Sequence, residues 1–325
     1  MNITVLGSLE SEDPKSYDVV VDQVAAALRK QKHRVSIFGV YNDLRKFVSG
    51  FSRRKPDIVF NLVETFGDYV SGDSAVAGVM DLLGLRYTGG GPGELYLRQD
   101  KGLAKKVLAF EKDILYPHFA IFSKDADFET AGNLRMPLFV KPLTADASIG
   151  IDGESLVNDT TSLMKRVLMI HEKVKDSALV EEYIEGREFY VGVLGNREPV
   201  AFPPVEMDFS GLPEGIPHVA GTKAKWKKNS VEYKGTKSVL ADIPDELRAK
   251  LQKAAVDAYR ALRVRDYGRV DLRLTESGEI YVIEVNASCY LEAESEFAMA
   301  AKAMGIEFPE LAQKIVDLAV ERYGK

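Results

Sequence analysis

The chain has 325 residues, of which 46% are hydrophobic and 28% are charged. These proportions are typical of a globular protein and exclude disorder of the whole chain, and the length predicts about two domains or three small lobes. With 43 basic and 49 acidic residues the net charge is −6, so the basic surface of a nucleic-acid-binding protein is not expected.

Strands and helices alternate over the first 88 residues. Apolar spacing predicts strands at 3–7, 34–40 and 57–62 and helices at 17–30, 41–52 and 73–83. This order is typical of a parallel sheet that is covered by helices. Four glycines and a proline between Gly89 and Gly93 can continue neither a helix nor a strand, so we expect a boundary near residue 92.

The rest of the chain also mixes both element types. The sequence predicts a helix at 94–110, strands at 118–122, 137–142, 154–157 and 178–184, and helices at 125–134 and 159–174. The polar stretch 207–238 lacks periodicity and is typical of a functional or disordered loop. A helix at 244–262, a hairpin at 268–286 and helices at 295–304 and 308–323 complete the prediction.

Cysteine content and hydropathy exclude further classes of protein. The single cysteine, Cys289, excludes an internal disulfide framework and is expected to be a small buried residue rather than a nucleophile. No run of about 18 apolar residues predicts a membrane span, and the N-terminus lacks the pattern of a signal peptide. We therefore expect a cytoplasmic protein that binds small molecules and neither nucleic acid nor membrane.

The hairpin is predicted to turn at Ser277-Gly278. In that register one face is apolar, with Val270, Leu272 and Leu274 opposite Val285, Ile283 and Tyr281. On the other face Asp271 lies opposite Glu284, and Arg269 lies opposite Asn286. A three-residue loop would shift this pairing.

Two carboxylates that face each other across a sheet repel, which indicates a cation between Asp271 and Glu284. Their oxygens and that of Asn286 suit Mg²⁺ or Mn²⁺. Alternatively, Arg273 neutralises the pair and the cluster is an ordinary solvated strand face. Upstream, Lys141 ends a strand before a loop of small residues, which is typical either of a polyphosphate site or of a surface turn.

Taken in order, these segments resemble the ATP-grasp superfamily, and within it the D-alanine–D-alanine ligases. The matching segments are Phe60-Asn61, Leu85-Arg-Tyr-Thr-Gly89, Asp100-Lys101, Val140-Lys-Pro142, Ser148-Ile-Gly150, Val180-Glu-Glu-Tyr-Ile184, Gly186-Arg-Glu188, Arg269-Val-Asp271 and Ile283-Glu-Val-Asn286. The resemblance implies an α/β ATP-grasp fold. Its parts would be an N-terminal parallel-sheet domain (1–92), a central lobe (93–182) and a C-terminal lobe (183–325). ATP would lie between the two lobes.

The resemblance also implies roles for single residues. Lys101 and Lys141 match phosphate-binding lysines, and Lys237 matches a lysine that closes over the γ-phosphate. The residues that match the binding site of the base and ribose are Glu181, Tyr183, Ile184 and Glu188. The residues that match metal ligands for Mg²⁺ or Mn²⁺ are Asp271, Glu284 and Asn286.

For the reaction itself, Arg269 matches the arginine that stabilises a tetrahedral intermediate. Ser295 and Tyr290 lie where the second substrate is expected. Ala147 takes the position of the family's serine in the small-residue loop, and its neighbour Ser148 is the candidate catalytic residue there.

The first-substrate region departs from the ligase pattern. Lys15 lies near the position of an expected glutamate, Ser238 near that of an expected tyrosine, and 63–68 replaces a stretch rich in His and Gly. Glu292, Glu294 and Glu296 follow the metal-binding motif. They predict either a solvated face or the selection of a cationic acceptor.

These observations favour an ATP-dependent carboxylate–amine ligase that forms an acyl-phosphate intermediate and has a changed first-substrate site. The alternatives are an authentic D-alanine–D-alanine ligase, a nucleotide-binding protein without ligase activity, and a kinase. Its substrates would be amino acids or another acid and amine, and the resemblance permits a homodimer.

Overall fold

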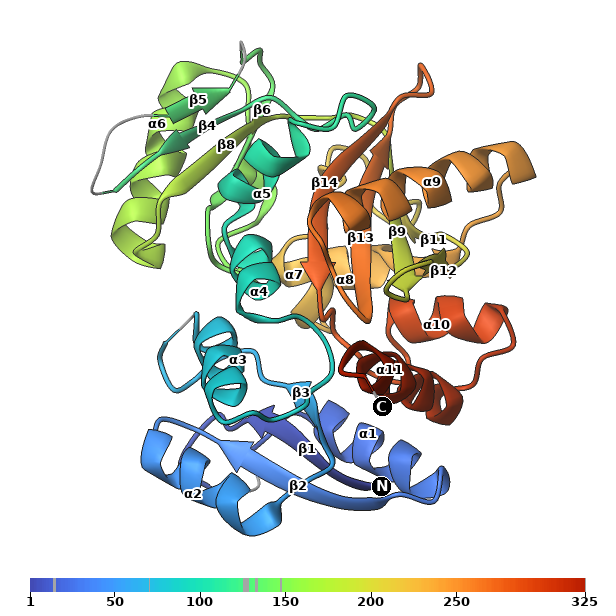
Figure 1. Cartoon of the computed structure of the whole chain (residues 1–325). Helices are drawn as coiled ribbons and strands as arrows, with labels where there is room; N and C mark the ends of the chain where they lie inside the picture. Colours follow the sequence, from blue (N-terminus) through green and yellow to red (C-terminus); the bar gives the residue numbers. More distant parts are fainter. Residues whose placement is uncertain (14–15, 70, 125–128, 132–133, 147, 325) are drawn as a thin grey trace.

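The structure is a computed structural model that describes residues 1–13, 16–69, 71–124, 129–131, 134–146 and 148–324. Its strands form three sheets, and each sheet lies in one of the three ranges 1–92, 93–182 and 183–325. Figure 1 shows the three parts, with the N-terminal sheet below and the other two sheets side by side above it. Of the helices described, none combines the length and apolar character that a membrane span requires.

The N-terminal sheet is parallel, with strand order β2-β1-β3. Its elements are β1 (Asn2–Ser8), α1 (Val19–Lys30), β2 (Arg34–Val40), α2 (Leu44–Arg54), β3 (Ile58–Leu62) and α3 (Gly72–Leu82). The predicted order is therefore confirmed. Helices α1 and α2 begin later than predicted because the side chains of Asp18 and Asp43 accept hydrogen bonds from the first backbone N–H groups.

The helix predicted at 94–110 is two helices, α4 (Pro92–Gln99) and α5 (Lys101–Leu108). Asp100 separates them, because its backbone leaves the helical region and its carboxylate accepts a hydrogen bond from the N–H of Leu103. This break starts a new helix that directs Lys101 and Lys105 toward the space between the other two sheets, where both are buried.

The central sheet is antiparallel, with strand order β5-β4-β8-β6-β7. Its elements are β4 (Phe119–Phe122), β5 (Glu129–Ala131), β6 (Leu138–Pro142), η1 (Gly153–Ser155), β7 (Leu156–Val157), α6 (Thr160–Met169), η2 (Ile170–Val174) and β8 (Ala178–Glu182). The helix predicted at 125–134 is wrong where the chain is described, because 129–131 pairs with the free edge of β4. Pairing at an available sheet edge outweighs a weak local helix preference.

The C-terminal sheet has the order β12-β11-β9-β13-β14, with β10 paired to β9. Its strands are β9 (Arg187–Leu194), β10 (Val200–Ala201), β11 (Val205–Asp208), β12 (Lys237–Leu240), β13 (Tyr267–Leu274) and β14 (Ile280–Ala287). Its helices are α7 (Thr222–Trp226), α8 (Val231–Gly235), α9 (Asp245–Ala261), α10 (Glu296–Ala303) and α11 (Phe308–Arg322). The sequence analysis missed β9 to β12, and the predicted loop at 207–238 contains α7 and α8.

The hairpin register is as predicted from Asp271 toward the start of β13, and it is shifted by one residue on the side of the turn. Asp271 pairs with Glu284 as expected, but Leu272 pairs with Val282 and Leu274 with Ile280. The turn has three residues, 276–278, with Gly278 at φ 88°. The extra residue, Ile283, forms a bulge in β14 that restores the predicted pairing beyond it.

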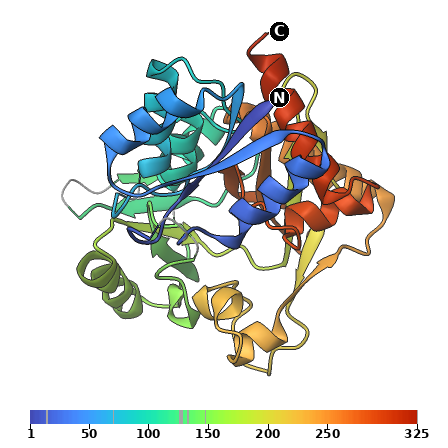
Figure 2. The same cartoon turned by 90° about the horizontal axis from the view of Figure 1, so that it is seen from below.

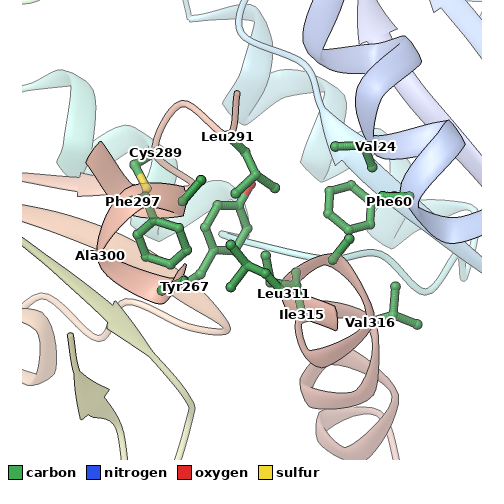
Figure 3. Close-up of a cluster of buried hydrophobic side chains, with 14 of the residues drawn as sticks. Val24, Phe60, Tyr267, Cys289, Leu291, Phe297, Ala300, Leu311, Ile315 and Val316 are labelled. Carbon is green, nitrogen blue, oxygen red and sulfur yellow. The ribbon is translucent and has the colours of Figure 1, made fainter. Parts of the chain in front are cut away.

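One buried cluster joins the two ends of the chain (Figure 3). Val24 of α1 and Phe60 of β3 pack against α11, whose Leu311 and Ile315 are fully buried. Tyr267 at the start of β13 belongs to the same cluster. The N-terminal sheet therefore shares its core with the C-terminal lobe, and Figure 2 shows α1 next to the C-terminal helices.

Candidate active site

A cavity lies between the central and C-terminal sheets. Its lining residues include Pro117, Phe139, Lys141, Ser148, Ile151, Glu181, Glu182, Tyr183, Ile184, Glu188, Tyr190, Val219, Ala220, Lys225, Asp271, Arg273, Ile283 and Glu284. The β14 bulge matters here, because it allows both Ile283 and its neighbour Glu284 to face the cavity. Many residues predicted for a nucleotide site are thus brought together.

The most deeply buried charges are on Glu181 and two lysines. Glu181 lies 2.8 Å from Lys105 Nζ and 2.8 Å from Lys141 Nζ, and all three side chains are at most 5% exposed. Although burial disfavours the charged form of Glu181, the two lysines hold its pKa below the usual value. Lys105, which the sequence analysis missed, also donates to the carbonyl of Ile283 at 3.1 Å.

Asp271 and Glu284 face each other on β13 and β14, as predicted. Arg269 binds Asp271 through two hydrogen bonds of 2.7 and 2.9 Å, and Lys101 lies 3.7 Å from Glu284. Burial opposes ionisation of Glu284, but Lys101 and Lys141 lower its pKa to about 2. Burial raises the pKa of Asp271 despite the nearby Arg269.

The predicted Mg²⁺ or Mn²⁺ site depends on oxygen atoms from both carboxylate and amide side chains. Asn286 lies beside Asp271, with its Nδ2 3.3 Å from Asp271 Oδ2. No group of three His, Cys, Asp or Glu residues suited to a metal occurs in the described part of the chain. Two carboxylates and an amide on neighbouring strands nevertheless match the hard oxygen donors that Mg²⁺ prefers. The residues present therefore fit such an ion.

At the other end of the cavity, Arg273 organises the predicted base and ribose residues. It lies 2.6 Å from Glu188 and donates to the carbonyl of Ile184 at 3.4 Å, and its guanidinium is 5.5 Å from the ring of Tyr183. Tyr190 also donates to Glu188 at 2.7 Å. The alternative in which Arg273 neutralises the metal-site carboxylates is therefore wrong, because β9 supplies its partner.

The segment between β11 and β12 folds over the small-residue loop. Ser148 donates to the carbonyl of Ala220 at 3.1 Å, and the hydroxyl of Thr222 donates to the carbonyl of Ser148. This places Lys225 in the cavity lining. The predicted Lys237 instead lies exposed on β12 opposite Asp208, outside this lining. In Figure 2 this segment, in yellow, lies beside the central lobe, in green.

The residues predicted near the second substrate are dispersed. Ser295 caps α10, donating to the carbonyl of Glu292 and accepting from the N–H of Ala298. Tyr290 donates to Asp18 at 3.2 Å, and it lines a second cavity between the N-terminal sheet and the C-terminal lobe. Cys289 is buried as expected, and burial raises its pKa to about 12.

Of the predicted departures around the first substrate, the stretch 63–68 contributes Val63, Glu64 and Thr65 to this second cavity. Its lining includes Glu10, Glu64 and Arg98. Lys15 and Ala147 lie outside the described residues. Ser238 donates to Glu296 at 3.0 Å instead of reaching either cavity lining.

The sequence analysis did not predict the roles of four residues at the first cavity. Three of them, Tyr190, Lys225 and Arg273, line the cavity, and the fourth, Lys105, pairs with the lining residue Glu181. Lys105 follows Lys101 by four residues, which places both on one helix face, so that spacing was an available signal. Lys225 lay in a lysine-rich stretch without periodicity, where the sequence offers no means of choosing one lysine.

Comparisons with known proteins agree with this geometry. The family model "D-ala D-ala ligase C-terminus" matches residues 110–317. An uncharacterized protein of Sinorhizobium fredii is 33% identical over 94% of this chain and 88% of its own length. A D-alanine–D-alanine ligase of Carboxydothermus hydrogenoformans is 30% identical over 98% of this chain and 97% of its own.

Two solved structures show the same fold. A D-alanine–D-alanine ligase from Bacillus anthracis in complex with ATP has a TM-score of 0.76 at 22% identity, covering 99% of this chain and 98% of that one. The VanG D-Ala:D-Ser ligase from Enterococcus faecalis has a TM-score of 0.74 at 24% identity, covering 98% and 99%. The predicted α/β fold of the ATP-grasp type is therefore confirmed.

Proposed function

Because the chain belongs to the D-alanine–D-alanine ligase family of ATP-grasp proteins, we propose that it is an ATP-dependent ligase that joins a carboxylate to an amine. One observation carries the proposal. The cavity between the two lobes combines buried Lys141 and half-buried Lys225 with two opposed carboxylates, Asp271 and Glu284. This is the charge arrangement that phosphoryl transfer from ATP needs.

The reaction would proceed in two balanced steps. The donor carboxylate attacks the γ-phosphorus of ATP, so that ADP leaves and an acyl phosphate forms. The acceptor amine then attacks the acyl carbon, phosphate leaves, and the nitrogen loses a proton. Lys101, Lys141 and Lys225 would offset negative charge on the transferred group, and Glu188 would hold the ribose.

Asp271, Glu284 and Asn286 would hold Mg²⁺ or Mn²⁺, which would supply positive charge next to the phosphates. Arg269 would stabilise the oxyanion of the tetrahedral intermediate, a role whose loss commonly costs about 10²–10³ in rate. Its two hydrogen bonds to Asp271 hold the guanidinium beside this carboxylate.

We also propose that the first substrate is not bound as in a ligase for D-alanine. The lining of the second cavity includes three acidic residues, Glu10, Asp18 and Glu64, and the cation Arg98. Arg98 is held by Asp73 at 2.8 Å and Asp146 at 3.2 Å. An authentic D-alanine–D-alanine ligase remains the second candidate, favoured by the relatives that carry that name.

Hydroxylamine trapping tests the proposal directly. The protein is incubated with ATP, Mg²⁺, hydroxylamine and single D- or L-amino acids or simple carboxylic acids. Formation of a hydroxamate together with ADP is the expected result for at least one acid. Mass spectrometry of paired substrates then identifies the product, and D-alanyl-D-alanine from D-alanine alone would establish the second candidate. ADP release with no hydroxamate for any acid would contradict the acyl-phosphate mechanism.

A further inference from the structure

Three side chains share one face of β13, and two of them, Arg273 and Asp271, line the first cavity. Arg273, Asp271 and Arg269 are two residues apart, so they share a face of the strand. Arg273 lies at the end with Tyr183, and Asp271 lies beside the opposed Glu284. Arg269 therefore lies beyond the carboxylates, at the end from which an acceptor would reach the phosphorylated donor.

A glutamate from outside the sheet meets Arg269 at this end. Glu296 begins α10, and its Oε2 lies 3.6 Å from Arg269 Nη1. Its Oε1 accepts one hydrogen bond of 3.0 Å from Ser238. A carboxylate has about four acceptor positions, so Glu296, which is 25% exposed, keeps capacity for a further donor.

Arg269 has less capacity left. Two of its nitrogens bind Asp271, and the guanidinium lies 4.7 Å from the ring centre of Tyr190. One arginine thus faces two carboxylates, Asp271 and Glu296. An acceptor that brought its own carboxylate to Arg269 would enter beside Glu296 and be repelled.

We propose that Glu296 selects an acceptor amine that lacks a free carboxylate and carries a second positive charge or hydrogen-bond donor. This inference rests on the proposed ligase function and assigns the acceptor class of that site. The acceptor would place its ammonium or amide N–H group on Glu296, which fixes the reacting nitrogen near Arg269. Burial opposes ionisation of Glu296, yet Arg269 holds its pKa below the usual value, so the carboxylate is charged at neutral pH.

Two matched pairs of amines test this without knowledge of the donor. The full chain is loaded with Mg²⁺ and a non-hydrolysable ATP analogue, and calorimetry measures the Kd of each amine. D-alaninamide is compared with D-alanine, which differs by one carboxylate, and putrescine with n-butylamine, which lacks the second charge. We expect the first member of each pair to bind at least about tenfold more tightly.

The variant Glu296→Gln should reduce both ratios to below about threefold. Glu294→Gln is the matched control, because Glu294 is an exposed glutamate two residues earlier in the chain. It should leave both ratios unchanged. If Glu296 only stabilised the start of α10 or held Arg269 in place, the variant would weaken both members of a pair alike and the ratios would persist.

Several results would overturn the inference. These are equal or tighter binding of D-alanine by the wild-type protein, ratios that survive in Glu296→Gln, or no binding of any of the four amines. The ratios of Kd values measured with the wild-type protein test the inference even if the variant Glu296→Gln does not fold. Hydroxylamine trapping needs no acceptor site, so failure of the ligase proposal appears there, whereas failure of this inference leaves trapping intact.

Discussion

The buried charge cluster around Glu181 gives the sharpest test of the site's energetics. We consider Glu181→Gln, which keeps the shape of the side chain and removes its charge. The change leaves the ammonium groups of Lys105 and Lys141, each 2.8 Å from Glu181, without their shared partner. Both lysines are at most 5% exposed, so water cannot replace the lost charge.

Breaking one buried ion pair costs about 3–5 kcal/mol of unfolding free energy. Two lysines lose the same partner here, but each keeps another interaction. Lys105 still donates to the carbonyl of Ile283 at 3.1 Å, and Lys141 remains in the field of Glu284. We therefore expect a total loss of about 3–5 kcal/mol rather than twice that amount.

Urea unfolding of the nucleotide-free protein measures this loss. Glu182→Gln is the matched control, because Glu182 is next in the chain and its ion pair is a surface pair with His118, which is 54% exposed, at 3.5 Å. The control should lose at most about 1 kcal/mol. A second change, Lys105→Met in the Glu181→Gln background, should restore at least about half of the lost stability by removing one uncompensated charge. A loss below about 1 kcal/mol for Glu181→Gln, or no recovery in the double variant, would refute the reasoning.

Three further predictions concern Glu284 and the folded segment between β11 and β12. Glu284→Gln should slow hydroxamate formation by at least about 10²-fold in the trapping assay with Mg²⁺; unchanged rates would remove Glu284 from the metal site. Because the pKa of Glu284 is lowered from 4.5 to about 2, its stabilisation of about 3 kcal/mol is present above pH 4.5 and lost as the pH falls toward 2. The stability difference between wild type and Glu284→Gln, measured by urea unfolding from pH 5 to pH 2, should shrink accordingly. Thr222→Val, which removes the hydrogen bond to Ser148, should speed limited proteolysis within 209–236 several-fold. In the wild type, the ATP analogue with Mg²⁺ should slow the same cleavage. Equal cleavage rates of the wild type with and without the analogue would contradict closure of this segment over the nucleotide.

The fold was predictable where local signals decide it. The parallel N-terminal sheet follows from apolar periodicity, and Asp100 at a helix start is a local signal for the break between α4 and α5. Strand β5 (129–131) was not predictable in this way, because it forms only through pairing with the edge of β4. Strands β9 to β12 were missed for a related reason. The sequence analysis assigned no element to 185–206 and predicted a loop at 207–238, and these strands pair with distant β13 and with one another.

The contacts of the candidate site were likewise predictable only where local sequence signals decide them. Opposition of Asp271 and Glu284 was predictable because a period of two and a tight turn fix which residues face each other. The partner of Arg273 was not, because Glu188 lies 85 residues away on β9. Lys225 and Lys237 could not be separated, since the backbone path that carries one lysine into the cavity depends on contacts with the loop of Ser148.

The β14 bulge shows how a single residue links register to chemistry. A three-residue turn alone would carry a one-residue offset along the whole hairpin, and Asp271 would then pair with Ile283. The bulge at Ile283 absorbs the offset, so that Asp271 meets Glu284 while Leu272 still meets buried Val282. Both the apolar face and the opposed carboxylates depend on the bulge, which leaves Ile283 unpaired. Deleting Ile283 should therefore remove the bulge while Asp271 stays opposite Glu284, and it removes the carbonyl that Lys105 uses, so that the lysine cluster would be damaged and the pairing of the two carboxylates would persist.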